Sequence, residues 1–205
     1  SVARLIGSPP GYVGYDDGGQ LTEAVRRNPY SIVLFDEIEK AHKDVFNILL
    51  QILDDGRITD SQGRTVDFKN TIIIMTSNLG SEYILDNDEN SHEMVMNELR
   101  HTFKPEFINR IDEIIIFNLL SKNVVYEILD KIVHEIEHRL DDKKLKLVLT
   151  DKAKKYIVDN AYDEKYGARP IRRYVSRNIE TLLAKAIIEE KVKFNSTVTI
   201  DFQDD

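Results

Sequence analysis

Two acidic residues follow a short aliphatic run near the start of the chain. Residues 32–35 read IVLF, and Asp36 and Glu37 come directly after them. Such a run predicts a buried parallel strand, and open α/β sheets bind ligands at the carboxyl ends of their strands. One carboxylate there can hold Mg²⁺ directly or through water, and the next can polarise an attacking water. The same residues also fit a strand that simply ends in solvated acids.

A second polar cluster follows another strand-like run. Residues 71–76 read TIIIMT, and Ser77 and Asn78 come next. If the two runs form neighbouring strands, Asn78 lies beside the two acids, where its amide could orient the water and contact a phosphate. The alternative is an asparagine that ends a strand in an ordinary turn.

The surrounding residues predict the elements that position these side chains. Ser8 to Gly19 contains two prolines and four glycines, which predicts a loop. Further predicted elements are helices at 20–27, 43–55 and 94–103, a loop or hairpin at 57–67, an acidic surface loop at 85–93 and a third strand at 113–117. A strand, a helix and another buried strand imply an α/β sheet with crossover connections.

The pattern changes near Leu119. The predicted elements beyond it are helices at about 121–140, 150–160 and 170–190 and strands at 145–149 and 197–202. Ser121 and Thr150 are suitable caps for the first two helices, and Pro170 suits the first turn of the third. We therefore predict a large α/β domain at residues 1–118 and a smaller, mostly helical domain with a short β-sheet at 119–205.

Composition argues against several classes of function. The 205 residues carry 28 Lys and Arg against 36 Asp and Glu, a net charge of −8, whereas nucleic-acid binding needs clustered cations. The absence of cysteine excludes disulfides and thiolate metal sites. No apolar run approaches the ~20 residues of a membrane span. We therefore expect neither a nucleic-acid nor a membrane partner. We expect the protein to be located in the cytoplasm or an organelle matrix, and a secretory vacuole is an open alternative.

Four motifs together resemble one protein family. They are GSPPGYVGY at 7–15, FDEIEKAH at 35–42, PEFINRID at 105–112 and YGARP at 166–170. In this order they are similar to the second ATPase module of Clp-family AAA+ unfoldases, over essentially the whole chain. The resemblance implies a P-loop-type AAA+ α/β large domain, truncated at its amino terminus, followed by a small helical domain. It also implies ATP and Mg²⁺ as cofactors.

The resemblance assigns a role to each matching nucleotide-site residue. Asp36 and Glu37 would be the Walker B pair, with Asp36 holding Mg²⁺ through water, and Asn78 would be the sensor-1 residue. Arg110 would be an arginine finger that reaches the nucleotide of a neighbouring subunit, because a guanidinium stabilises charge developing on the γ-phosphoryl group. Arg169 would be the sensor-2 arginine. Read without the family, Arg110 and Arg169 are ordinary surface arginines, the former pairing with Asp112 or Glu113.

The resemblance also assigns the contact with substrate. Tyr12, together with Val13, would be the pore loop that grips a threaded polypeptide. The segment Asp60 to Arg64 is a candidate for a second, lower pore loop. Without the family, Tyr12 fits equally well as a ring packed on the body of the protein.

The expected function is that of a hexameric ring chaperone that uses ATP to unfold, disaggregate or translocate unfolded or aggregated polypeptides, with a co-chaperone as a candidate partner. Residues 79–99 lack the Ile-Gly-Phe tripeptide with which protease-partnered members dock on their peptidase, which favours a ClpB-type disaggregase. The alternatives are the unfoldase subunit of a Clp protease (ClpC- or ClpA-type) and a non-catalytic AAA+ assembly domain. The intact acids, amide and arginines argue against the last.

One family motif is missing. A P-loop reads Gly-x-x-x-x-Gly-Lys-Ser/Thr, and this chain contains no Gly-Lys dipeptide. In the family, that motif lies upstream of the position that matches Ser1. We therefore expect the chain to be the carboxyl-terminal part of a larger machine. On its own it should neither bind ATP tightly nor hydrolyse it, and its second domain should be the more autonomous one.

Overall fold

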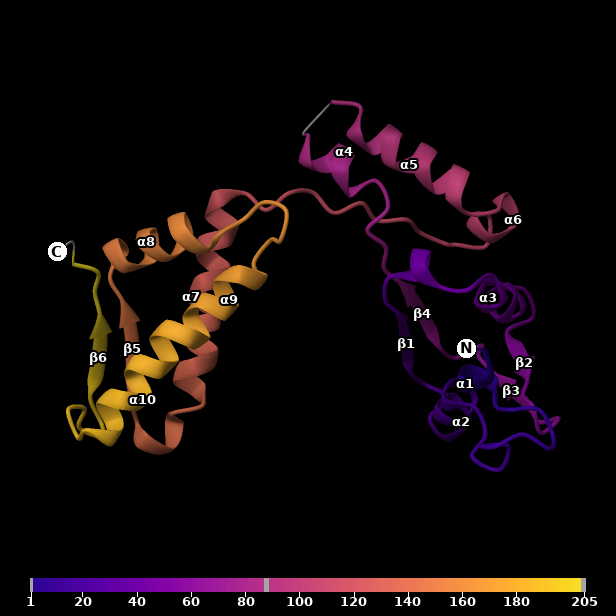
Figure 1. Cartoon of the computed structure of the whole chain (residues 1–205), viewed down its shortest axis with the longest axis horizontal. Helices are drawn as coiled ribbons and strands as arrows, with labels where there is room; N and C mark the ends of the chain where they lie inside the picture. The colour runs from indigo at the N-terminus through magenta and orange to yellow at the C-terminus, as the bar shows by residue number, and fades with distance from the viewer. Residues whose placement is uncertain (1, 87–88, 204–205) are drawn as a thin grey trace. The chain divides into compact units, whose positions relative to one another are not determined.

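The computed structural model describes residues 2–86 and 89–203 and divides into two compact units, Ser1–Ile116 and Phe117–Asp205 (Figure 1). The elements of the first unit are α1 (Val2–Ile6), α2 (Gln20–Arg27), β1 (Ile32–Phe35), η1 (Ile38–Lys40), α3 (Lys43–Asp55), β2 (Arg57–Thr59), β3 (Thr65–Asp67), β4 (Ile72–Met75), α4 (Ser81–Leu85), α5 (Ser91–Thr102) and α6 (Pro105–Ile108). Among the described residues, no helix combines the length and apolar character that crossing a membrane requires.

A parallel strand pair organises the first unit. β1 and β4 run in the same direction, with Ile32 opposite Ile72 and Phe35 opposite Met75. α3 and the β2–β3 hairpin lie between them in the sequence, as a crossover connection requires. Because the strands are parallel, their carboxyl ends emerge at the same edge.

The two faces of this strand pair differ in burial. Val33, Phe35 and Ile73 point into the apolar clusters under α2 and α3. On the opposite face, large aliphatic side chains are exposed: Ile32 66%, Leu34 59%, Ile72 60% and Ile74 42%. The prediction that both strands are buried is therefore correct for the inward face and wrong for the opposite face. Among the described residues, only one face of the sheet is covered by helices.

Two further predictions for the first unit need correction. Residues 113–117 form no strand, and Ile115 and Phe117 are 66% and 82% exposed. An aliphatic run becomes a strand only when a neighbouring backbone accepts its hydrogen bonds, and no described strand does so here. The predicted acidic loop at 85–93 is helical at both ends: α4 includes Leu85, and α5 begins at Ser91. Residues 87 and 88 lie outside the described part of the chain.

The second unit packs three helical segments against a parallel strand pair. Its elements are α7 (Lys122–His138), η2 (Asp141–Lys143), β5 (Lys146–Leu149), α8 (Asp151–Ala161), α9 (Arg169–Tyr174), η3 (Val175–Glu180), α10 (Thr181–Ile188) and β6 (Thr197–Ile200). The Ser121 hydroxyl accepts a hydrogen bond from the Val124 amide, and that of Thr150 accepts one from the Ala153 amide. Both predicted caps are confirmed, and they set where α7 and α8 begin.

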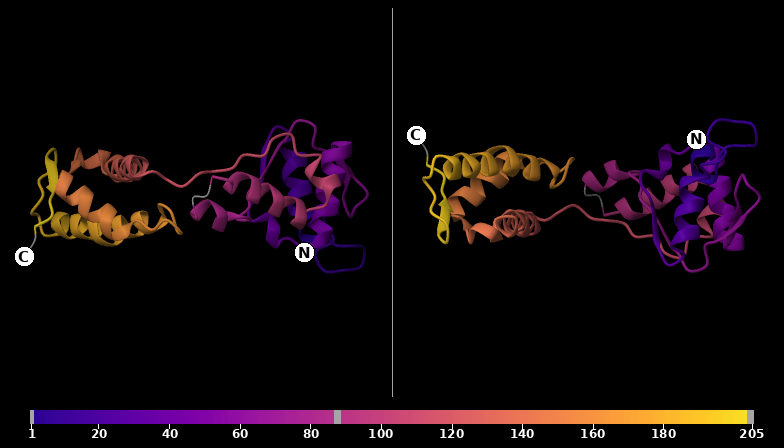
Figure 2. Two further views of the ribbon diagram at one scale, coloured as in Figure 1. Left: turned by 90° about the horizontal axis from the view of Figure 1, so that it is seen from above. Right: turned by 90° about the horizontal axis from the view of Figure 1, so that it is seen from below.

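The core of this unit is continuous. Residues of α7, β5 and the helices that follow form one buried cluster that includes Val125, Leu129, Ile171 and Val175, each with no exposed surface, and β6 packs against it. Figures 1 and 2 show β5 and β6 side by side along one flank of the unit. The predicted helix at 170–190 is present, but residues 175–180 in its middle are wound as a π-helix.

Candidate functional site

The candidate acids and the candidate amide emerge at one edge of the sheet. Asp36 and Glu37 follow β1, and Asn78 follows β4 by three residues. The direct pairing of β1 with β4 supplies the neighbour relation that the prediction for Asn78 required. All three side chains are exposed, so a ligand at this edge has access to them.

Thr76 ties the two strand ends together. Its amide donates to the Phe35 carbonyl at 2.9 Å, and its carbonyl accepts from the Ile38 amide at 2.9 Å. Its hydroxyl donates to Oδ1 of Asp36 and accepts from the Glu37 amide at 3.1 Å. The sequence interpretation assigned Thr76 no role. A signal for this role is present in the sequence: Thr76 carries a hydroxyl group and comes directly after β4, the strand that pairs with the one preceding the two acids.

Glu37 adopts an unusual backbone conformation. Its φ and ψ are 54° and 52°, in the left-handed region, which costs a non-glycine residue about 1–2 kcal/mol. The bonds from Thr76 to the flanking amides hold this turn in place. The Glu37 carboxylate lies 2.8 Å from Lys40 Nζ, and this hydrogen bond, together with the charge of Glu37, raises the pKa of Lys40. Backbone strain of this kind is concentrated at functional sites.

The donor set at this edge suits Mg²⁺ bound together with a nucleotide. Oδ1 of Asp36 is occupied by the Thr76 hydroxyl, while the exposed carboxylate retains further lone pairs. Among the described residues, no three His, Asp or Glu side chains gather into a self-sufficient metal cage. Mg²⁺ is ordinarily held by one or two carboxylates, with phosphates and water completing its shell. Asp36 fits that arrangement.

Arg110 lies two residues beyond the end of α6 and forms an ion pair with Asp54 in the last turn of α3. The predicted alternative partners, Asp112 and Glu113, are therefore wrong. Phe107 of α6 packs edge-on against Phe46 of α3, with ring centroids 5.3 Å apart, and this contact holds α6 in place. α3 has 13 residues and is about 20 Å long, and the acids precede its other end. Arg110 is thus anchored away from the acids of its own chain.

Tyr12 and Val13 lie on the loop formed by residues 8–19, which we call the Tyr12 loop. Tyr12 is 70% exposed and Val13 fully exposed, so the alternative of a ring packed on the body does not match the structure. Gly11 and Gly14 flank them with φ of 85° and 86°, values that favour glycine. Figure 2 shows the loop, in indigo, projecting from the first unit.

Arg169 is the first residue of α9 and belongs to the second unit, whereas the other candidate residues belong to the first. Its side chain is exposed, and no ion pair to it is found within the described part of the chain. The preceding turn is shaped by Gly167, whose φ is 62° and whose amide donates to the Asp163 carbonyl at 2.7 Å. Arg169 is therefore presented to solvent by a well-defined turn.

Comparison with known proteins gives consistent matches along the chain. A family model described as "AAA domain (Cdc48 subfamily)" matches residues 1–114. A second, described as "C-terminal, D2-small domain, of ClpB protein", matches residues 120–200. Chaperone protein ClpB of Bacillus cereus is 59% identical over 99% of this chain. The protein of the same name from Lactiplantibacillus plantarum is 58% identical over the whole chain. The chain spans about a quarter of the length of these curated relatives, 24% in each case.

Solved structures agree with the sequence matches. The S. cerevisiae Hsp104–ADP complex superposes with a TM-score of 0.88 at 43% identity, covering 98% of this chain and 36% of that one. A complex of S. cerevisiae Hsp104 with casein, in the extended conformation, gives a TM-score of 0.85 at 43% identity, covering 96% and 35%. The predicted fold class, an AAA+ α/β domain followed by a mostly helical domain with a short sheet, is confirmed. The chain belongs to the AAA family, and its residues 120–200 match the model of the D2-small domain of ClpB.

Proposed function

We propose that the chain works within a longer, ring-forming ClpB-type chaperone that uses ATP hydrolysis to unfold, disaggregate or translocate polypeptides through a central pore. The observation that carries this proposal is the polar edge of the β1–β4 pair. There, Thr76 links the Asp36 and Glu37 turn to the strand that leads to Asn78. The names of the relatives support the same conclusion.

Each side chain at this edge has a task in phosphoryl transfer. Asp36 holds Mg²⁺, which neutralises charge on the phosphate oxygens. Glu37 polarises the attacking water, and Asn78 orients it. The exposed position of Asn78 beside the acids supports this division of roles. The chain contains no P-loop sequence, so phosphate cradling is a task for other residues of the longer protein.

The two arginines complete the proposed site. Arg110 acts on the nucleotide of a neighbouring subunit in a homohexamer, which makes hydrolysis depend on assembly. Its anchoring at the far end of α3 supports action in another subunit. Arg169 reaches the phosphates bound by its own subunit. Tyr12 and Val13 grip unfolded or aggregated polypeptide, and the exposure of both side chains on a projecting loop supports this role.

The test is the substitution Glu37→Gln in the full-length protein. We expect ATP turnover to fall by about 100-fold or more, because removing a positioned acid–base group costs that much, while nucleotide binding persists. The matched control is Glu82→Gln, at an exposed acid on α4, which should leave turnover unchanged. Normal turnover in Glu37→Gln would contradict the proposal and favour a non-catalytic assembly role. Co-sedimentation with a Clp-type peptidase would instead favour the protease-coupled alternative.

A further inference from the structure

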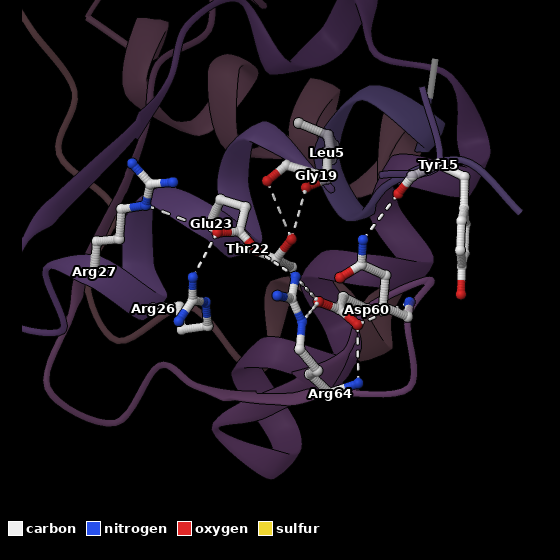
Figure 3. Close-up of polar contacts among 10 residues, drawn as sticks. Leu5, Tyr15, Gly19, Thr22, Glu23, Arg26, Arg27, Asp60 and Arg64 are labelled. Atoms are coloured by element: carbon white, nitrogen blue, oxygen red, sulfur yellow. Dashed lines mark hydrogen bonds and ion pairs between the residues drawn. The ribbon is translucent and has the colours of Figure 1, made fainter. Parts of the chain in front are cut away.

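The turn Asp60–Arg64, which joins β2 to β3, is built around a buried carboxylate (Figure 3). The Asp60 side chain has 0% exposure. It accepts hydrogen bonds from the amides of Gln62 and Arg64, both at 2.9 Å, and from Nε of Arg64 at 2.8 Å. Burial alone would raise the pKa of Asp60. The amide and guanidinium of Arg64 and the amide of Gln62 outweigh burial and lower the pKa. Hydrogen bonds within the turn therefore hold it in one conformation.

The turn Asp60–Arg64 donates hydrogen bonds to the Tyr12 loop and to the segment that leads into it. Nε2 of Gln62 donates to the carbonyl of Tyr15 at 2.9 Å, and the amide of Ser61 donates to the carbonyl of Ile6 at 3.0 Å (Figure 3 shows the first). Gly7 lies so close that a Cβ placed there would stand 2.1 Å from Oγ of Ser61. Gly7 also has a φ of 100°, which favours glycine, so a larger residue there would strain the backbone and displace the Ser61 hydroxyl.

The exit of the same loop is held through α2. The Arg64 guanidinium forms an ion pair with Glu23, and hydrogen bonds from Arg26 and Arg64 lower the pKa of Glu23. The hydroxyl of Thr22, which is fully buried, donates to the Gly19 carbonyl at 3.2 Å. The entry, the middle and the exit of the Tyr12 loop are thus fixed, while Tyr12 and Val13 at its tip stay exposed.

We propose that the turn Asp60–Arg64 is the seat that holds the Tyr12 loop in its working position, with Gln62 as the positioning residue. This inference rests on the proposed grip of Tyr12 on polypeptide. The segment was predicted from sequence as a second loop that contacts substrate. In the structure, its polar groups are engaged with the chain itself, which gives it a supporting role that needs no contact with substrate.

The test compares Gln62→Glu with Gln51→Glu in the full-length protein. The first substitution keeps the size of the side chain but removes the amide donor to Tyr15, and the second makes the same change at an exposed position on α3. With Gln62→Glu we expect about threefold to tenfold slower unfolding of a folded domain that carries an unstructured tail. We also expect faster hydrogen exchange at the amides of residues 12–18, with basal ATP turnover unchanged. Gln51→Glu should match the wild type in all three measurements.

The Tyr12→Ala background separates the possible failures. If the seat acts through Tyr12, then Gln62→Glu adds no further loss of unfolding rate in that background. An equal loss in both backgrounds overturns the inference, as do wild-type exchange and unfolding rates for Gln62→Glu alone. If Tyr12→Ala itself leaves unfolding intact, the proposed grip of Tyr12 fails instead.

Discussion

The two units of this chain bury their apolar residues in different ways. Among the described residues, the second unit gathers fifteen buried side chains into one cluster, whereas the first divides eleven between two clusters of seven and four. Their strand pairs differ on the inward face. β5 buries Leu147 and Leu149 at 5% exposure each, whereas Val33 and Phe35 of β1 are only partly buried.

The contrast separates stability from chemistry. The second unit has a continuous core and a single candidate site residue, Arg169. The first unit has the strained Glu37 turn, the exposed acids and the projecting Tyr12 loop, on a sheet with one uncovered face. An exposed apolar face and strained backbone both lower stability. The unit that carries most of the proposed chemistry is therefore expected to be the weaker one.

The largest expected effect is seen when the units are produced separately. Residues 117–205 alone should unfold cooperatively on heating, because their core is contained within the unit. Residues 1–116 alone should bind a dye specific for exposed apolar surface and melt without a sharp transition. Differential scanning calorimetry and dye fluorescence give both results. A sharp transition for residues 1–116 alone would contradict the expectation that the first unit is the less stable one.

A core truncation sharpens the comparison within the second unit. Leu129→Ala should lower the free energy of unfolding by about 2–5 kcal/mol, because Leu129 has no exposed surface and the loss leaves a cavity. Leu182 on α10 is 59% exposed, so Leu182→Ala should change the free energy of unfolding by no more than about 0.5 kcal/mol. Denaturant titration measures both. Equal costs would show that the core is not continuous.

Removal of one hydroxyl tests whether chemistry and stability are separate. In the full-length protein, Thr76→Val should lower kcat for ATP by about tenfold, because it removes the donor to Asp36 and the acceptor for the Glu37 amide. Thr76→Ser retains the hydroxyl and should stay within about twofold of wild type. The calorimetric transition of the second unit should not move in either variant. Equal losses in Val and Ser variants would point to packing rather than hydrogen bonding.

Acid should weaken the first unit before the second. The pKa of Asp60 is lowered in the fold, so its stabilisation is present above its usual value of 3.8 and is lost as pH falls through the lowered folded pKa. The second unit also has carboxylates with lowered pKa, such as Glu135 and Asp159, but their ion pairs are partly exposed and contribute little. Asp60→Asn should flatten the pH dependence of the first unit below pH ~4 in unfolding titrations. An unchanged slope would assign the acid sensitivity to other groups.

The smallest effect is expected on the uncovered face of the sheet. Leu34→Ser should change the stability of this chain by less than about 0.5 kcal/mol, because Leu34 is 59% exposed. It should also reduce binding of the apolar dye. The control is Val33→Ser on the inward face, which should cost more stability because Val33 packs on the buried cluster. A large loss for Leu34→Ser would mean that this face is covered.

Much of the fold could be predicted because it depends on neighbouring residues. The helix stripes, the caps at Ser121 and Thr150 and the strands that precede the two polar clusters are local patterns, and the structure has each of them. The failed strand at 113–117 has an equally good local pattern. It fails because a strand requires a partner, which the pattern of one segment does not supply.

The sequence motifs alone indicated the family of this chain and the chemical groups available to it: two acids, an amide, two arginines and a tyrosine on a glycine-rich loop. Only the folded chain revealed Thr76 bonded to Asp36, Asp54 paired with Arg110 and Gln62 bonded to Tyr15. Each of these contacts joins residues about 40 to 60 positions apart. Local patterns cannot encode such contacts, because they arise from strand register and helix packing, which set where distant side chains meet.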